Sequence, residues 1–212
     1  KLLQGRSFDV VAVVGFNHSV HFPRIAVFPS GRFSTPLGEI PVDPDAAAAL
    51  LEYSDSFVRN DSLFSGEHSL DNQLPFLQRT LGNFRLLPVM MGSQDEGNIA
   101  ELAAALADVL EGRDALLVAS TDMSHFWPYE EANALDAEMI DRITDYDIAG
   151  VKKLMQGDPT GRRMCGHGVV RAVMTAARSL GADTVVELEY ANSRDTYGST
   201  GGRGVVGYLA AA

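Results

Sequence analysis

The sequence is short of several residue types, and each shortage excludes a class of protein. It has one cysteine in 212 residues, which excludes an internal disulfide and is typical of a reducing cytoplasm. Only 17 Lys and Arg stand against 28 Asp and Glu, a net charge of -11, and the basic residues are scattered, so we expect no nucleic-acid partner. No apolar run approaches the roughly 20 residues of a membrane span, and no signal peptide is apparent. We therefore expect a cytoplasmic protein without a membrane partner.

Common catalytic motifs are also missing. The sequence contains no G-x-S-x-G elbow, P-loop, C-x-x-C pair or H-E-x-x-H helix. A closed structural zinc site would need more cysteines than the chain has. What remains is an open site with mixed nitrogen, oxygen and sulfur ligands, which suits a catalytic or redox-active metal better than a structural one.

The composition, 46% hydrophobic and 21% charged, is typical of one globular domain over residues 1–212. The apolar run Val10-Val11-Ala12-Val13-Val14, closed by Gly15, predicts a strand over 9–14 that is buried on both faces. Further strands are expected at 24–28, 84–90, 115–119, 184–192 and 204–209, and helices at 44–53, 69–81, 98–111, 129–146, 148–156 and 168–180. Residues 33–42 read as irregular extended chain, and 54–66 and 193–202 as loops. This alternation predicts an α/β fold, with a mostly parallel or mixed central sheet and helices on both faces.

Histidine is scarce, and all five histidines fall in or beside predicted loops. The strand at 9–14 delivers His18 beyond its carboxyl end, where ligands of open α/β sheets usually bind. His18 is therefore the first candidate metal ligand. His68 precedes the helix predicted at 69–81, and it either borders the same pocket or has only a capping role.

The stretch Ser120-Thr121-Asp122-Met123-Ser124-His125 follows another strand. Asp122 and His125 are three residues apart, so on a helical turn they would share one face. Asp122 could ligate a metal while His125 acts as acid and base, or it could orient His125. A simpler interpretation makes Asp122 the N-cap of the following helix.

Cys165 lies just before the helix predicted at 168–180, beside Arg162 and Arg163. The helix dipole and the two positive charges would both favour the thiolate, which is a metal ligand or a nucleophile. The alternative is a small buried hydrophobic residue.

Taken together, these stretches resemble the Memo-like proteins, whose bacterial and archaeal members are called AmmeMemoRadiSam system protein B. The resemblance covers nearly the whole chain. The motifs that carry it are, in order, Gly15-Phe16-Asn17-His18, Ser34-Thr35-Pro36-Leu37-Gly38, Glu67-His68-Ser69-Leu70 with Gln73-Leu74-Pro75-Phe76, Ser120-Thr121-Asp122-Met123-Ser124-His125, Cys165-Gly166 and Tyr190-Ala191-Asn192-Ser193.

The resemblance implies a fold shared with the class III extradiol dioxygenases and a pocket that binds iron, Fe(II), with copper as a second metal. Carried over, it makes His18, Asp122 and Cys165 the metal ligands, with His125 beside Asp122 and His68 at the border of the pocket. We expect His125 or His68 to move protons there, as imidazoles can near neutral pH. Two departures stand out. The A-P-H-A-G-Y motif of the family, with its strand and its further His ligand, is missing from this chain, and Gln73 stands where animal members have His.

Two hypotheses of function follow. The first is a non-haem iron-dependent, dioxygenase-like oxidoreductase acting on an unknown small molecule. The second is a non-catalytic scaffold that binds a peptide or an anion, with anion contacts from Arg24, Arg32, Arg194 and Arg203. The family name also implies an accessory role beside a radical-enzyme partner.

Overall fold

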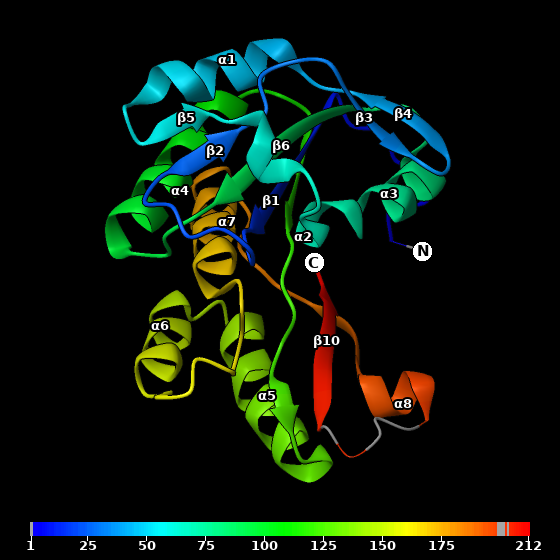
Figure 1. Ribbon diagram of the computed structural model, residues 1–212, viewed down its shortest axis with the longest axis vertical. Coiled ribbons are helices and arrows are strands. Elements are labelled where there is room, and N and C mark those ends of the chain that lie inside the picture. The colour runs from blue at the N-terminus through cyan, green and yellow to red at the C-terminus, as the bar shows by residue number, and fades with distance from the viewer. Residues whose placement is uncertain (1, 199–201, 203) are drawn as a thin grey trace. The chain divides into compact units, whose positions relative to one another are not determined.

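The computed structural model describes residues 2–198, 202 and 204–212 (Figure 1). The chain divides into two compact units. Unit 1 comprises Lys1–Ser120 and Gly168–Leu180, and unit 2 comprises Thr121–His167 and Gly181–Ala212. Each unit has its own sheet. One domain over residues 1–212 stays a prediction.

Unit 1 contains a five-stranded sheet in the order β5-β2-β6-β1-β7. The central strand β1 runs parallel to both of its neighbours, whereas β2 is antiparallel to β6 and parallel to β5. This mixed, mostly parallel sheet confirms the α/β prediction. The strands are β1 (Val10–Phe16), β2 (Ile25–Val27), β5 (Phe57–Arg59), β6 (Arg85–Met91) and β7 (Ala115–Ala119).

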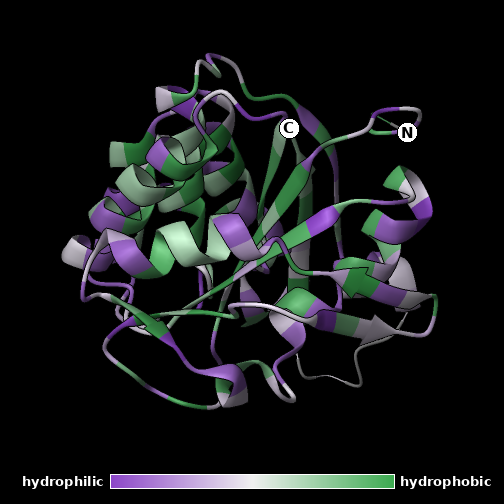
Figure 2. Cartoon of the chain, turned by 90° about the horizontal axis from the view of Figure 1, so that it is seen from above, coloured by the Kyte–Doolittle hydropathy of each residue, from purple (hydrophilic) through white to green (hydrophobic). Residues whose placement is uncertain are grey.

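Both faces of this sheet are covered, because successive side chains of β1 point to opposite faces and none of those from Val10 to Val14 is exposed. One face packs against α1 (Pro44–Tyr53), α4 (Glu96–Leu110) and α7 (His167–Ser179). The other packs against η1 (Asp61–Phe64), α2 (His68–Asp71), α3 (Leu74–Leu81) and the hairpin of β3 (Arg32–Thr35) and β4 (Gly38–Pro41). In Figure 2 the central strands are correspondingly green, the colour of hydrophobic residues.

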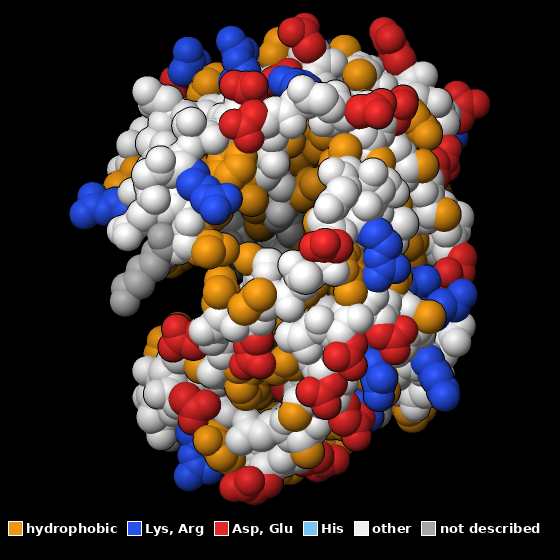
Figure 3. All heavy atoms as spheres, turned by 180° about the vertical axis from the view of Figure 1, so that it is seen from behind, with side chains coloured by type: hydrophobic (Ala, Val, Ile, Leu, Met, Phe, Trp, Pro, Cys, Tyr) orange, Lys and Arg blue, Asp and Glu red, His pale blue; other side chains and the backbone are white. Residues whose placement is uncertain are grey.

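Unit 2 contains a three-stranded antiparallel sheet in the order β8-β10-β9, which the sequence analysis did not predict. Its elements are β8 (His125–Trp127), α5 (Tyr129–Thr144), α6 (Ile148–Gln156), β9 (Glu187–Asn192), α8 (Ser193–Tyr197) and β10 (Val205–Ala211). Among the described residues, no helix combines the length and apolarity that a membrane span requires. On the face drawn in Figure 3, Lys and Arg side chains are interspersed with Asp and Glu.

Several local predictions were wrong. Residues 69–81 lie in two helices, α2 and α3, rather than in the single predicted helix. Pro75 lies in the first turn of α3, where its missing N–H costs no hydrogen bond. Residues 33–42 contain most of the β3–β4 hairpin, and residues 54–66 contain β5 and η1.

The polar stretch after β9 begins with a helix, α8, instead of a loop. Its capping box pairs the Asn192 side chain with the backbone of Asp195 and the Asp195 side chain with the backbone of Asn192. The end of the predicted loop at 199–201, and Arg203 of the proposed anion contacts, lie outside the described residues.

Candidate metal centre

The first part of the site is the close approach of α2 to the end of β1. A Cβ atom added to Gly15 would overlap Leu70 Cδ1 and Ser69 Oγ. Any larger residue here would therefore force the side chains of α2 to move away from β1. Gly15 therefore lets α2, with Glu67 before it, pack directly beside the loop that carries His18.

Asn17 shapes that loop. Its side chain is buried and donates to the Leu63 carbonyl oxygen at 2.8 Å, while its Oδ1 accepts from the backbone N–H groups of Ser19 at 3.0 Å and Val20 at 2.6 Å. Such a turn reverses the chain immediately after the strand. His18 is fixed at the apex, with its side chain 31% exposed.

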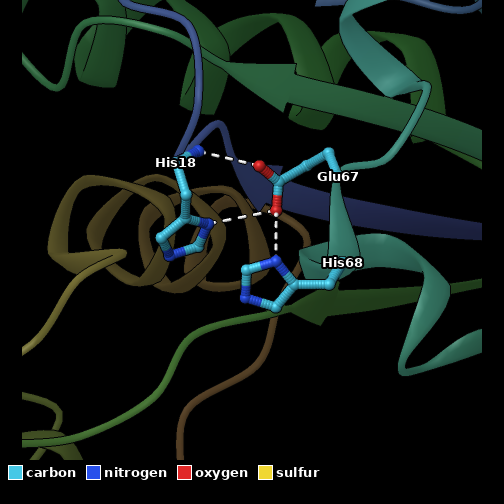
Figure 4. A group of neighbouring side chains, drawn as sticks. All are labelled: His18, Glu67 and His68. Atoms are coloured by element: carbon cyan, nitrogen blue, oxygen red, sulfur yellow. Dashed lines mark hydrogen bonds and ion pairs between the residues drawn. The ribbon is translucent and has the colours of Figure 1, made fainter.

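Glu67 lies between His18 and His68 and contacts both side chains. Its side chain is 2% exposed, and its Oε2 accepts from the His18 backbone N–H at 2.7 Å. Its Oε1 accepts from the Ser69 N–H at 2.9 Å and lies 3.0 Å from His18 Nδ1 and 3.4 Å from His68 Nδ1 (Figure 4). Glu67 therefore caps α2 and contacts both imidazoles.

The two imidazoles lie against each other, with ring centroids 4.7 Å apart and planes inclined by 31°. His68 is the first residue of α2, and its side chain is 59% exposed. Potential ligand atoms of His18, Glu67 and His68 lie within 4.8 Å of one another. Among the described residues of unit 1, these three form a group that could hold a metal ion.

The Glu67 carboxylate is charged at neutral pH. Burial by itself would raise the pKa of Glu67, but hydrogen bonds from the His18 and Ser69 N–H groups and the His18 imidazole together lower it below its ordinary value. A buried carboxylate with this hydrogen-bonding pattern carries a negative charge that favours a cation beside it.

Unit 2 brings together three other predicted residues. Asp122 Oδ2 lies 3.5 Å from His125 Nε2, and the Asp122 backbone N–H points to Cys165 Sγ at 3.4 Å. Asp122 and His125 do meet, but not on a helical turn, because the segment is a loop that leads into β8. Asp122 is not the N-cap of α5 either, since Pro128 occupies that position.

The expectation of a stabilised Cys165 thiolate was wrong for the metal-free protein. Burial raises the pKa of the Cys165 thiol, and the hydrogen bonds from Thr121 and the Asp122 N–H only partly offset this, while the charge of Asp122 adds to it. The two neighbouring arginines are engaged elsewhere: Arg162 lies over the Trp127 ring at 4.2 Å, and Arg163 pairs with Glu138 at 2.8 Å.

The predicted ligands His18, Asp122 and Cys165 are thus divided between the two units, and their convergence on one ion stays a prediction. Within unit 1, the residue that sequence reasoning missed is Glu67. It is the N-cap of α2, but glutamate is not one of the residues preferred at that position, so no capping signal marks it. Its contact with His18, 49 residues away, has no local signal in the sequence.

The fold and the group around Glu67 define an α/β protein with a candidate metal-binding site beyond the carboxyl end of the central strand. The profile of a family described as "Memo-like protein" matches residues 1–212. The chain belongs to this Memo-like family.

Individual relatives support this family membership. A MEMO1 family protein of Methanosarcina mazei is 37% identical over 207 residues, which cover 95% of this chain and 74% of that protein. A MEMO1 family protein of Methanopyrus kandleri is 34% identical, covering 95% of this chain and 71% of that protein. The crystal structure of uncharacterized protein JW3007 from Escherichia coli K12 has a TM-score of 0.64 at 15% identity, covering 97% of this chain and 86% of that one. This last likeness concerns the fold alone.

Proposed function

We propose that this chain is a metal-binding redox protein with a dioxygenase-like fold and that its metal is iron, Fe(II), with copper as a second metal that it accepts. The observation that carries the proposal is the group of two imidazoles and one buried carboxylate in unit 1. Imidazole nitrogens are ligands that suit both iron and copper, and the buried carboxylate lies beside both rings. Hence the two imidazoles fit the metals that the family resemblance implies.

His18 and His68 would hold the ion. When bound, the metal would supply one-electron chemistry and open positions for oxygen or an oxygen-bearing small molecule. The residues of this chain have separate tasks. Asn17 fixes the loop of His18, and Glu67 holds both rings from the buried side. His125 could exchange a proton at Nε2, the atom that faces Asp122.

The test is iron content. Purified protein is dialysed against a chelator, reloaded with Fe(II) without oxygen, desalted and analysed for metal. His18→Ala should retain far less iron than wild type. His21→Ala is the matched control, because His21 is an exposed histidine of the same loop, and it should retain as much iron as wild type. Equal iron in His18→Ala and wild type would refute the proposal.

The predicted ligands Asp122 and Cys165 are tested by the same measurement on Asp122→Ala and Cys165→Ala. Oxygen uptake by the iron-loaded protein with a reductant then separates the redox function from the second hypothesis, a scaffold that binds a peptide or an anion. Iron retention without any oxygen uptake would favour that scaffold.

A further inference from the structure

The group around Glu67 admits two arrangements of ligands. In one, the carboxylate and both imidazoles all bind the metal. In the other, the carboxylate holds the two imidazoles from behind, and only the rings bind. The hydrogen bonds of Glu67 distinguish the two arrangements.

The lone pairs of Glu67 are nearly all used. A carboxylate offers about four lone-pair sites. Oε1 already accepts from the Ser69 N–H and faces Nδ1 of both His18 and His68, while Oε2 accepts from the His18 N–H. Binding a metal through Oε1 would displace these donors, among them a backbone N–H that α2 needs at its start.

The burial of the three side chains also favours the arrangement in which only the rings bind the metal. The Glu67 side chain is 2% exposed, whereas those of His18 and His68 are 31% and 59% exposed. An ion from solvent therefore meets the rings first. Figure 4 shows Nδ1 of each ring directed at the carboxylate and the other nitrogen, Nε2, turned away from it.

We propose, resting on the function proposed above, that Glu67 is a positioning residue that fixes His18 and His68 as Nδ1–H tautomers and so presents their two Nε2 lone pairs to one transition-metal ion. Metal-binding histidines commonly donate their second N–H to a carboxylate, which orients the ring and raises its basicity. Here a single carboxylate serves two rings. Nitrogen ligands of this kind select Fe, Zn, Cu or Ni over Ca or Mg.

The first experiment measures the tautomer of each ring. Long-range ¹⁵N–¹H spectra of the imidazoles are recorded on metal-free protein and after addition of Zn(II) as a diamagnetic probe, with His18→Ala and His68→Ala used for assignment. Both rings should be Nδ1–H tautomers without metal. With Zn(II), both Nε2 signals should shift while the Nδ1 protons remain. Nε2–H tautomers, or Zn(II) bound at Nδ1, would overturn the inference.

The second experiment tests the positioning role. Glu67→Gln keeps the shape but replaces one acceptor oxygen by an NH₂ group, and we expect about 10- to 100-fold weaker Zn(II) binding together with mixed tautomers. Asp71→Asn is the matched control. It removes the charge of a nearby exposed carboxylate of α2, which interacts electrostatically with Glu67 and His68 but lies outside the group of three residues, and it should weaken binding far less. An equal loss in both variants would show that charge alone matters, which contradicts positioning.

The two proposals fail in different ways. If wild-type protein binds neither Zn(II) nor Fe(II), the proposed function fails, yet the tautomers of the metal-free rings still decide the role of Glu67. If the metal binds but the rings carry their protons on Nε2, the function survives and the positioning role does not. The tautomer measurement needs no Glu67 variant, so misfolding of Glu67→Gln leaves the inference testable.

Discussion

Asp136 should be among the residues of unit 2 whose loss costs the most stability. It lies on α5 and is fully buried. Its Oδ1 accepts from the Ser124 N–H at 2.9 Å, and its Oδ2 accepts from the Tyr190 hydroxyl at 2.7 Å. A Cβ atom on Gly207 would lie 1.9 Å from Oδ2, so β10 packs directly on this carboxylate. Asp136 therefore joins the loop of Asp122 and His125 to β9 and β10.

The expected loss of stability in Asp136→Ala follows from these two hydrogen bonds. Asp136→Ala leaves two donors without their acceptor, at about 1–3 kcal/mol each, so the free energy of unfolding should fall by about 2–6 kcal/mol. Tyr190→Phe removes one donor and should cost about 1–3 kcal/mol. In the double variant the losses should be less than additive, because the two residues share one hydrogen bond.

The assay is urea denaturation followed by circular dichroism. Asp141→Ala is the matched control, since Asp141 is an exposed aspartate of the same helix, and we expect a change within about 0.5 kcal/mol. The reasoning would be refuted if Asp136→Ala were as stable as Asp141→Ala. That result would mean that the cost of burying the carboxylate cancels its hydrogen bonds.

Three further changes have defined outcomes. Burial and then the hydrogen bond to Asp136 raise the pKa of Tyr190 above its ordinary value of 10.0. The stability that the protonated hydroxyl contributes is therefore fully present below pH 10 and is lost progressively as the pH rises above 10. Between pH 9 and 12, the free energy of unfolding of wild type should fall more steeply with pH than that of Tyr190→Phe. Gly15→Ala should lower the thermal midpoint, at a cost of about 1–3 kcal/mol, because its Cβ would overlap Leu70 and Ser69. Phe126 has φ 60° and is 59% exposed, so Phe126→Gly should relieve about 1 kcal/mol of left-handed strain and raise that midpoint.

The fold of unit 1 could largely be predicted because its signals are local. Five successive apolar residues that start at Val10 predict a strand buried on both faces, and the structure has that strand at the centre of the sheet. Asp43 and Pro44 predict a helix start, and the Asp43 side chain does accept from the Ala46 N–H. Such signals depend only on neighbours along the chain.

The antiparallel sheet of unit 2 could not be predicted in the same way. β8 has only three residues, and its pairing with β10 joins His125 to Val206, which are 81 positions apart. The register also shifts beside Val205, so no regular alternation marks the strand. Whether such a short, irregular strand forms depends on its pairing with residues far away in the sequence, and the hydrophobic periodicity of the sequence carries no signal of that pairing.

Glu67 illustrates the same limit at the site. Sequence motifs single out residue types that can bind a metal, and His18 was proposed as a ligand on that basis, whereas His68 was proposed only as a proton-transfer group beside the pocket. A carboxylate that acts through other residues is defined instead by its contacts. Glu67 accepts hydrogen bonds from the backbone N–H groups of residues 18 and 69, and it lies beside the rings of His18 and His68. Gly15 and Asn17 help to form the same arrangement. Gly15 allows α2 to approach the end of β1, and Asn17 turns the loop that carries His18. The motif Gly15-Phe16-Asn17-His18 is thus best understood as a means of holding one imidazole against a buried carboxylate supplied by a distant helix start.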